Sequence, residues 1–460
     1  MATRATFLTG RTPRGHGVRC NGIPLDPSLP TFTQALKEAG YRTHAIGKIH
    51  ANPWMPHKAF NSASLNPAEW PEAIPLWDAN RITDVPLPYY GFESVDILCG
   101  WTSGHYRQWL QEREPNFKAL LGPPPTEAVK ETPESTFPSQ LPTDLNYTYW
   151  ASDCSDRFLA DIAPQQQPFF LWCSIPDPHP PYSVAEPYYS MYDPENMPEP
   201  IRREGELESL PPHYRHLFER GIPTAGRFAR TDIPREQERK AAAVVCGIVT
   251  QWDAMVGRIM AQLQQYGLAD NTVVTVLSDH GQMLGDHWMR SMPPSHFDGN
   301  LRVPAVWWYP KEFEQNHESP ALASHLDFAP TILDLAGVPI PEGRVPPTPE
   351  CAQQRPPWPG RSLAPILRGQ QTHVQESVIA ENDADYLGMR QRTLITERYH
   401  ITAYIGETYG ELYDLQSDPK QLYNLWSSAA HQAIRNSLLI RMLHRFAETD
   451  STLPRRLGHA

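Results

Sequence analysis

The sequence predicts an α/β fold in which a mostly parallel central sheet is flanked by helices on both faces. Short strands at 41–46, 169–175 and 273–277 each follow a segment with apolar residues at helical spacing, and this alternation is typical of parallel sheets with helical crossovers. The last two strands are nearly unbroken aliphatic and aromatic runs, as expected of strands covered on both faces. After residue 376 short strands and a closing helix predict a small C-terminal antiparallel sheet with one helix.

Taken in order, the elements begin with a helix over residues 3–9, with Thr3 as its cap and Gly10 at its end. Residues 52–140 are rich in aromatic residues and prolines but weak in periodicity, so we expect an insertion around a pocket there. Further helices are expected at 30–39, 150–162, 239–267, 324–337 and 429–446. Further strands are expected within 296–309 and at 377–380, 392–396, 400–404 and 411–415.

Two structural units follow from this order. A proline-rich linker ends near Pro359, and the pattern of the chain changes after it. We therefore expect a catalytic α/β domain over residues 1–370 and a C-terminal subdomain over residues 371–460.

Composition limits the partners that the chain can take. The net charge is −12, without clustered Lys and Arg, which argues against nucleic acid and leaves small molecules as the expected partner. We find no stretch of about 18 apolar residues and no signal peptide at residue 1, so no membrane is expected and the chain as written is expected in the cytoplasm. A homo-oligomer is compatible with these features. Six cysteines without CxxC spacing favour reduced thiols.

Three predicted strands carry polar side chains at their carboxyl ends, where ligands of open α/β sheets gather. These side chains are Lys48 and His50 after the first strand, His179 after the second, and Asp279 and His280 after the third. Such a group of side chains would suit a hard cation or a phosphate-like anion.

Each of these strand ends also has a plainer explanation. Asp279 and His280 would serve equally well as caps and loop hydrogen-bonding groups, and Lys48 and His50 as solvated loop residues. His179 lies among prolines and suits a turn. All three strand ends, however, carry a basic, acidic or imidazole side chain at the same type of position. This repetition favours the functional interpretation.

Several motifs, in order, carry a resemblance to a known family. They are Thr3-Arg-Ala-Thr-Phe-Leu-Thr-Gly-Arg11, Gly40-Tyr-Arg-Thr-x-x-x-Gly-Lys-x-His50, Leu277-Ser-Asp-His-Gly-x-Met-Leu-Gly-Asp-His287, Pro359-Gly-Arg-Ser-Leu363 and Gly410-Glu-Leu-Tyr-Asp-Leu-x-x-Asp-Pro419. Through these motifs the chain resembles the sulfatase family of the alkaline phosphatase superfamily over nearly its whole length.

The resemblance implies a divalent cation, usually calcium, with magnesium or manganese as alternatives. It also implies a formylglycine nucleophile, made from the first residue of a Cys-x-Pro/Ala-x-Arg motif. When Arg4 is aligned with the arginine of that motif, the nucleophile falls one residue before Met1. The family's first strand and its paired acidic ligands would also precede Met1. We therefore expect that this chain is truncated at its amino end.

The resemblance also implies roles for the site residues. Arg4 would hold the nucleophile and the sulfate charge, and Asp279 and His280 would complete the cation site. Lys48 and His179 would neutralise sulfate oxygens, and one of the two would protonate the departing alcohol. His50 would act as acid or base for the formylglycine hydrate.

Two weaker assignments concern substrate binding. Asn21 would add a hydrogen bond to the substrate, although a turn role is at least as compatible with its Gly-rich surroundings. Relatives carry a lysine that contacts the transferred anion at the position of Met292, and His296 or Arg290 would have to replace it.

These roles describe a sulfuric ester hydrolase that acts on a small organic sulfate ester. One alternative is a phosphonate monoester or phosphodiester hydrolase, since those relatives share the surroundings of Asn21 and the Asp-His pair. They tend to carry tyrosine and threonine where Lys48 and His50 stand, which favours the sulfate ester. A second alternative is a non-catalytic fragment.

Overall fold

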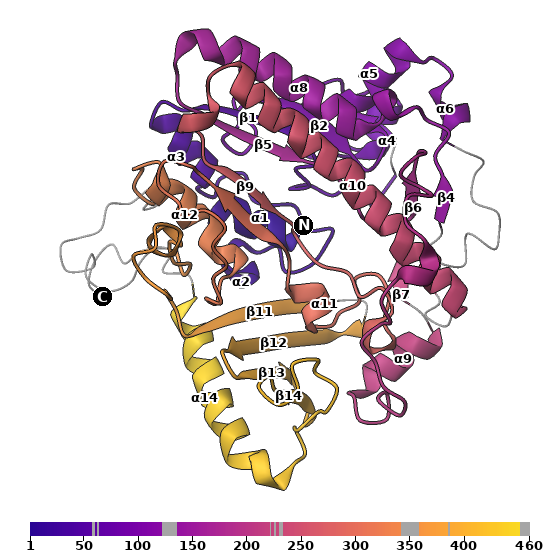
Figure 1. Ribbon diagram of the computed structural model, residues 1–460, viewed down its shortest axis with the longest axis vertical. Helices are drawn as coiled ribbons and strands as arrows, with labels where there is room; N and C mark the ends of the chain where they lie inside the picture. The colour runs from indigo at the N-terminus through magenta and orange to yellow at the C-terminus, as the bar shows by residue number, and fades with distance from the viewer. Residues whose placement is uncertain are drawn as a thin grey trace.

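A central sheet between two layers of helices confirms the predicted α/β architecture in the computed structural model (Figure 1). The structure describes residues 1–57, 60–61, 64–121, 136–220, 222–224, 227–229, 233–341, 358–384 and 387–450. The sheet has the order β3-β2-β1-β5. Its strands are β1 (Arg42–Gly47), β2 (Ser94–Cys99), β3 (Ser103–Gly104) and β5 (Phe169–Ser174). β1 runs parallel to both β2 and β5, and only the short β3 is antiparallel.

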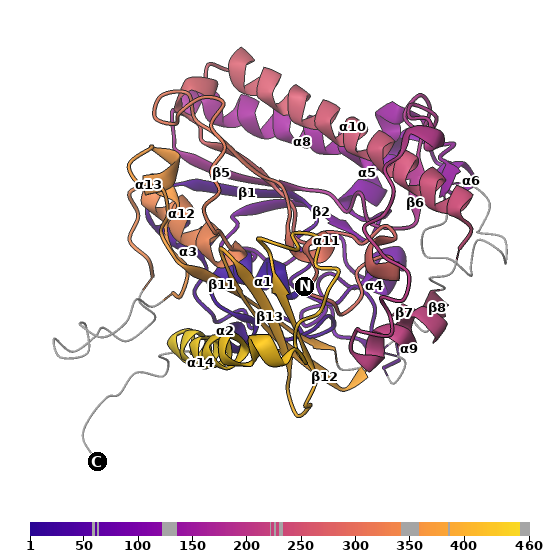
Figure 2. The same cartoon turned by 60° about the horizontal axis from the view of Figure 1, so that its bottom comes forward.

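Neighbouring residues of β1 bury their side chains on opposite faces of the sheet, as strand geometry requires. Ala45 joins a hydrophobic cluster with α1, α3 and α12, and Ile46 joins a second cluster with α8 and α10. These helices are α1 (Ala2–Thr9), α3 (Phe32–Glu38), α8 (Tyr147–Ile162), α10 (Arg235–Gln265) and α12 (Phe328–Leu335). Figures 1 and 2 show the two layers from different sides.

The ends of the first helices follow the sequence in most respects. α1 stops at Gly10, which has φ 62°, and Thr31 caps α3 by accepting a hydrogen bond from the Gln34 amide. The predicted cap at Thr3 is wrong, because α1 already begins at Ala2 and no side chain caps it.

The segment 52–140 contains a strand that its sequence does not reveal. β2 is a central strand, but Asp96 interrupts its apolar run. In the fold Asp96 Oδ2 lies 3.3 Å from His44 Nε2 on β1, so the carboxylate has a partner there. The same segment forms α4 (Ile74–Asp78), α5 (His105–Arg113), α6 (Phe117–Leu120) and β4 (Thr136–Pro138).

The strand predicted at 273–277 is present as β9 (Val274–Leu277), but its surroundings differ from the prediction. It pairs antiparallel with β10 (Ala305–Trp308) in a sheet of two strands, and its four residues are half-buried. The expectation of a parallel strand covered on both faces is therefore wrong here. The apolar run specifies a strand but not the direction of its neighbour.

The C-terminal part of the chain forms the antiparallel sheet and helix that were predicted. The strands β11 (Ser377–Ala384), β12 (Met389–Thr396), β13 (Tyr399–Tyr404) and β14 (Gly410–Asp414) pair in that order, and α14 (Gln432–Glu448) packs on them. Leu394 and Ile401 meet Leu438 and Met442 in this layer. Most of the proline-rich linker, residues 342–357, lies outside the described residues.

The remaining elements are short and connect these layers. They are α2 (Pro13–His16), β6 (Tyr182–Val184), α9 (Pro212–Arg220), β7 (Ile222–Thr224), β8 (Arg227–Ala229), α11 (Asp298–Leu301) and α13 (Ala364–Leu367), together with several 3-10 turns. The cysteines of the described residues are free.

In the part of the chain that the structure describes, α10 is the one helix with the length and composition of a membrane span. Its best window of 18 residues has a mean hydropathy of 1.2. Core helices can meet the same criteria, and α10 packs against α8 and β6. Length and composition therefore assign it no membrane role.

Candidate active site

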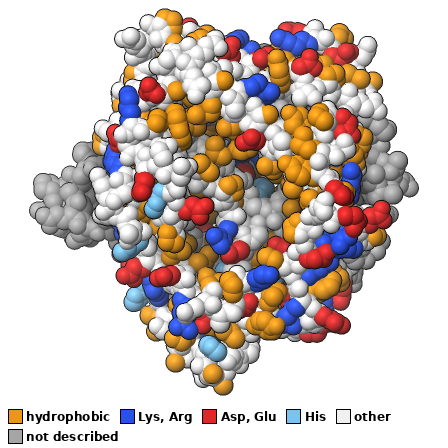
Figure 3. Space-filling model, viewed as in Figure 1, with side chains coloured by type: hydrophobic (Ala, Val, Ile, Leu, Met, Phe, Trp, Pro, Cys, Tyr) orange, Lys and Arg blue, Asp and Glu red, His pale blue; other side chains and the backbone are white. Residues whose placement is uncertain are grey.

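The Arg4 side chain joins the carboxyl ends of three strands. Its Nε donates to Asp279 Oδ2 at 2.8 Å, its Nη1 to the Lys48 carbonyl oxygen at 2.7 Å, and its Nη2 to Ser174 Oγ at 2.9 Å. The guanidinium is planar and presents its donors in a fixed fork, so one buried side chain sets the spacing of all three ends. Figure 3 shows the face of Figure 1, which is hollowed near its centre, where Figure 1 places the start of α1.

Lys48 is held against the same carboxylate by a close backbone crossing. Its Nζ lies 3.9 Å from Asp279 Oδ2, and its amide donates to the Ser174 carbonyl oxygen at 2.6 Å. The preceding residue, Gly47, has φ 85°, and a Cβ there would lie 1.9 Å from the Ser174 carbonyl oxygen. Only glycine allows the strand to approach so closely.

The charges of this cluster support one another. Burial would raise the pKa of Asp279, but Arg4 and Lys48 hold it well below its ordinary value, so the carboxylate is ionised. Burial lowers the pKa of Lys48 to about 8, and Asp279 opposes that shift. At neutral pH the Lys48 ammonium is therefore mostly protonated.

Two histidines face the cluster as neutral rings with a fixed tautomer. His179 Nδ1 lies 2.7 Å from the Pro180 carbonyl oxygen, and His280 Nδ1 lies 3.0 Å from that of Gly281. A carbonyl oxygen can only accept, so each Nδ1 carries the proton and each Nε2 has a free lone pair. Burial lowers the pKa of His179 to about 4 and also lowers that of His280. The two rings lie 6.3 Å apart, edge to face.

His50 lies in the same charged region. Burial, with smaller contributions from the Met1 amino group, Lys48 and Arg4, places its pKa well below the ordinary value. Its backbone has φ 54°, and its ring stacks on Trp54 with centroids 3.8 Å apart.

The two substrate-binding candidates have different surroundings. Asn21 Oδ1 accepts a hydrogen bond of 3.0 Å from the Met1 amino group, which itself lies in the field of Asp279 and Lys48. His296 is not part of this cluster, because its Nδ1 lies 2.6 Å from Thr393 Oγ1 on β12. Arg290 is paired with Glu238 on α10.

Three residues at the site escaped the sequence analysis. Ser174 binds Arg4, and its position as the last residue of a strand pointing to the site is the signal that could have found it. His325 Nε2 donates to the Ser278 carbonyl oxygen at 3.1 Å. Glu72 binds the loop that carries His50, and nothing in its local sequence indicates this.

Asp279 and His280 fit a divalent cation individually but do not form a site. A carboxylate and a neutral imidazole with a free Nε2 are suitable ligands, and Nε2 lies 3.7 Å from Asp279 Oδ1. Arg4 and Lys48, however, already neutralise the other carboxylate oxygen. Among the described residues no group of three or more His, Cys, Asp or Glu side chains could hold a metal ion.

Comparison with known families matches nearly the whole chain. The family model described as Sulfatase matches residues 1–338. The model described as N-sulphoglucosamine sulphohydrolase, C-terminal, matches residues 295–448. The first match includes every strand end of the cluster, and the second covers the C-terminal sheet and helix.

Individual relatives agree with these matches. The arylsulfatase of Clostridium perfringens is 24% identical over 94% of this chain and 81% of its own length. The multifunctional alkaline phosphatase superfamily protein PehA of Trinickia caryophylli is 26% identical over 98% of this chain and 85% of its own length. Among solved structures, the phosphonate monoester hydrolase SpPMH from Silicibacter pomeroyi superposes with a TM-score of 0.76 at 24% identity, over 100% of this chain and 88% of that chain.

Proposed function

This chain belongs to the sulfatase family, whose members are sulfuric ester hydrolases, and from that premise we propose that it hydrolyses a small organic sulfate ester. The observation that carries the proposal is the cluster of Arg4, Lys48 and Asp279, with the neutral ring of His179 close by. A buried cluster of cations beside proton acceptors suits a tetrahedral anion that must lose an alcohol.

The proposed division of labour follows from the charge of each group. Lys48 and Arg4 provide the positive field that stabilises sulfate oxygens as negative charge develops on them. Lys48 is protonated at neutral pH, so it is the better donor of a proton to the departing alcohol. His179 presents an unprotonated Nε2, so it would have to take up a proton from solvent before it could neutralise a sulfate oxygen.

His50 is proposed as the acid or base that serves the nucleophile. Its low pKa makes it a proton acceptor at neutral pH. The sulfatase family generally uses a divalent cation and a formylglycine residue, whose hydrate supplies the nucleophilic oxygen when it is present.

Turnover of paired substrates tests the proposal. Two proteins are compared: residues 1–460, and the same chain preceded by a cysteine that a formylglycine-generating enzyme can convert. The expected result is a higher kcat/KM for 4-nitrophenyl sulfate than for 4-nitrophenyl phenylphosphonate, with a loss of roughly a hundredfold in Lys48→Ala. Absence of turnover in both forms would support a non-catalytic protein instead.

A phosphonate monoester hydrolase is the second candidate, and a specific similarity favours it. PehA, which is described as a multifunctional protein, is 26% identical to this chain. The fold of the phosphonate monoester hydrolase SpPMH matches the whole chain. The Lys48 and His50 pair favours the sulfate ester, because phosphonate-cleaving relatives tend to carry other residues at these positions. A preference for the phosphonate in the assay would reverse the assignment.

A further inference from the structure

Glu72 is a completely buried carboxylate at a bend of the chain beside the site. It accepts hydrogen bonds from three successive backbone amides: that of His50 at 2.8 Å, that of Ala51 at 2.9 Å and that of Asn52 at 3.0 Å. Successive amides that converge on one anion form a nest, which favours negative charge. The nest begins at His50, whose positive φ turns its amide inward.

Two side chains complete the environment of this carboxylate. Trp54 Nε1 donates to it at 3.2 Å and the Tyr89 hydroxyl at 2.8 Å. Five oriented donors therefore surround its oxygens. Burial raises the pKa of Glu72, and the donors oppose that shift. Burying a carboxylate is unfavourable unless its oxygens are paired, and four of the five donors to Glu72 belong to the loop that follows β1.

The loop that Glu72 holds carries two of the proposed site residues. Arg4 and Ser174 fix the carbonyl and amide of Lys48 at its start. Glu72 fixes His50 through its amide, and it fixes Trp54, on which the His50 ring stacks. The backbone strain of a non-glycine residue at φ 54° persists where surrounding contacts determine it. The Leu25 and Ile74 amides donate to the carbonyl oxygens of Ala51 and Trp54, each at 2.9 Å. Glu72 adds the contacts that orient the three successive amides from His50 to Asn52.

We propose that Glu72 is a positioning residue of the site, which holds the loop of Lys48 and His50 in the geometry that binds the tetrahedral anion. This inference rests on the proposed function. It assigns Glu72 no contact with the substrate, since its oxygens already accept hydrogen bonds from the loop and from Tyr89. Its effect is transmitted through the three amides and the Trp54 indole.

The variant Glu72→Gln tests this role, because it keeps the shape of the side chain and removes the charge. The NH2 group of the Gln side chain only donates, so it would face N–H donors with which it cannot form hydrogen bonds. Hydrogen exchange of the amides in segment 49–54 is expected to become faster. The affinity for inorganic sulfate, measured by calorimetry, is expected to fall roughly tenfold to a hundredfold, as for other misplaced site groups. The melting temperature is recorded to identify unfolding.

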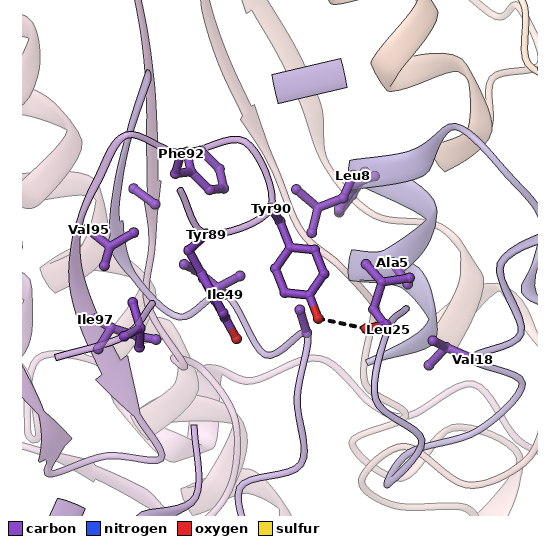
Figure 4. Packing of buried hydrophobic residues seen from close by; sticks show 14 of the residues in the cluster. Ala5, Leu8, Val18, Leu25, Ile49, Tyr89, Tyr90, Phe92, Val95 and Ile97 are labelled. Carbon is purple, nitrogen blue, oxygen red and sulfur yellow. Dashed lines mark hydrogen bonds between the residues drawn. The ribbon is translucent and has the colours of Figure 1, made fainter. Parts of the chain in front are cut away.

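Two neighbouring tyrosines give a milder variant and its matched control. Tyr89→Phe removes one donor to Glu72, whereas Tyr90 donates to the Leu25 carbonyl oxygen at 2.7 Å instead (Figure 4). Both hydroxyls also accept from Asn52 Nδ2, so the pair differs mainly in the contact with Glu72. We expect Tyr89→Phe to weaken sulfate binding and to loosen segment 49–54 in part, and Tyr90→Phe to do neither.

The two readouts separate this inference from the proposed function. Faster exchange together with weaker sulfate binding in Glu72→Gln or Tyr89→Phe supports the inference. Unchanged exchange and affinity in both variants overturn it. If the unaltered chain binds no sulfate while Glu72→Gln still loosens the loop, the proposed function fails and Glu72 is a structural anchor only, which also overturns the positioning role. Equal effects of Tyr89→Phe and Tyr90→Phe count against it as well.

Discussion

At the scale of the residue, the site depends on side chains that satisfy several partners at once. Arg4 is the main example, because its three hydrogen bonds reach the ends of β1, β5 and β9. Asp279 is ionised because Arg4 and Lys48 face it. A change at one of these positions therefore alters both the geometry and the charge of the cluster.

Arg4→Lys should lower kcat/KM for the sulfate ester by roughly a hundredfold, because an ammonium cannot reproduce the fork that spans three strand ends. The measurement is steady-state turnover of 4-nitrophenyl sulfate. Arg14→Lys is the matched control: Arg14 binds Glu381 at 3.0 Å and Asp450 at 2.8 Å at the surface, and its change should leave turnover within about twofold. A fully active Arg4→Lys enzyme would contradict the assigned role.

Asp177 predicts a pH dependence of stability. Burial raises its pKa from 3.8 to about 7, although Tyr147 and Lys48 act against that shift. Between these values the folded state binds more protons than the unfolded state, so stability falls as pH rises from about 4 to 7. Asp177→Asn removes this loss. Its stability relative to the unaltered chain should rise by about 4 kcal/mol between pH 4 and pH 8 in urea titrations.

The surface residue Asp161 provides the control for that experiment. Asp161→Asn lies on the exposed side of α8, and its stability relative to the unaltered chain should stay constant across the same pH range within about 0.5 kcal/mol. A parallel rise in both variants would show that the pH dependence does not come from Asp177.

At the scale of the element, the strand ends were predictable and some of their neighbours were not. The residues before Asp279 and before Lys48 have the apolar pattern of a short strand. Asp279 and Lys48 could therefore be predicted at the ends of strands from the sequence alone. Strand β2 was not predicted, because Asp96 interrupts its apolar pattern. The partner of Asp96, His44, lies on another strand and is distant in sequence. Glu72 escaped because its five donors come from residues 18 to 22 positions before it and 17 after it. Long-range pairing of this kind has no local signature.

The end of β1 makes a prediction about close packing. Gly47→Ala should lower the free energy of unfolding by about 3 kcal/mol or more, because a positive φ and a Cβ 1.9 Å from the Ser174 carbonyl oxygen are both unfavourable. Gly40→Ala shares the positive φ, at 92°, but its Cβ would meet nothing within 4 Å. It should cost only about 1 kcal/mol. Urea denaturation of both variants separates the steric clash from the backbone conformation, and equal costs would argue against the close crossing.

At the scale of the whole molecule, the C-terminal sheet is joined to the α/β body by polar contacts. Gln391 Nε2 donates to the Pro294 carbonyl oxygen at 2.7 Å, and Gln421 Nε2 donates to Asp298 Oδ1 at 2.8 Å. His296 lies in the same segment, and burial lowers its pKa to about 3, so the ring is neutral. Spacing along the sequence proposed His296 as a substitute for a substrate-binding lysine, but its observed contact is with β12. A spacing argument does not reveal which layer a loop crosses.

This interface predicts that the two parts of the chain unfold together. Thr393→Val keeps the shape of the side chain but leaves buried His296 Nδ1 without its partner and also removes a contact with Thr402. The free energy of unfolding should fall by about 1–3 kcal/mol in a single transition. Thr372→Val is the control, because Thr372 also faces a histidine, His373, but at the surface, and it should cost less than about 0.5 kcal/mol. The lost hydrogen bond lies between the C-terminal sheet and the α/β body. If Thr393→Val unfolded in two separate steps, the polar contacts of residues 293–298 would not couple the two units.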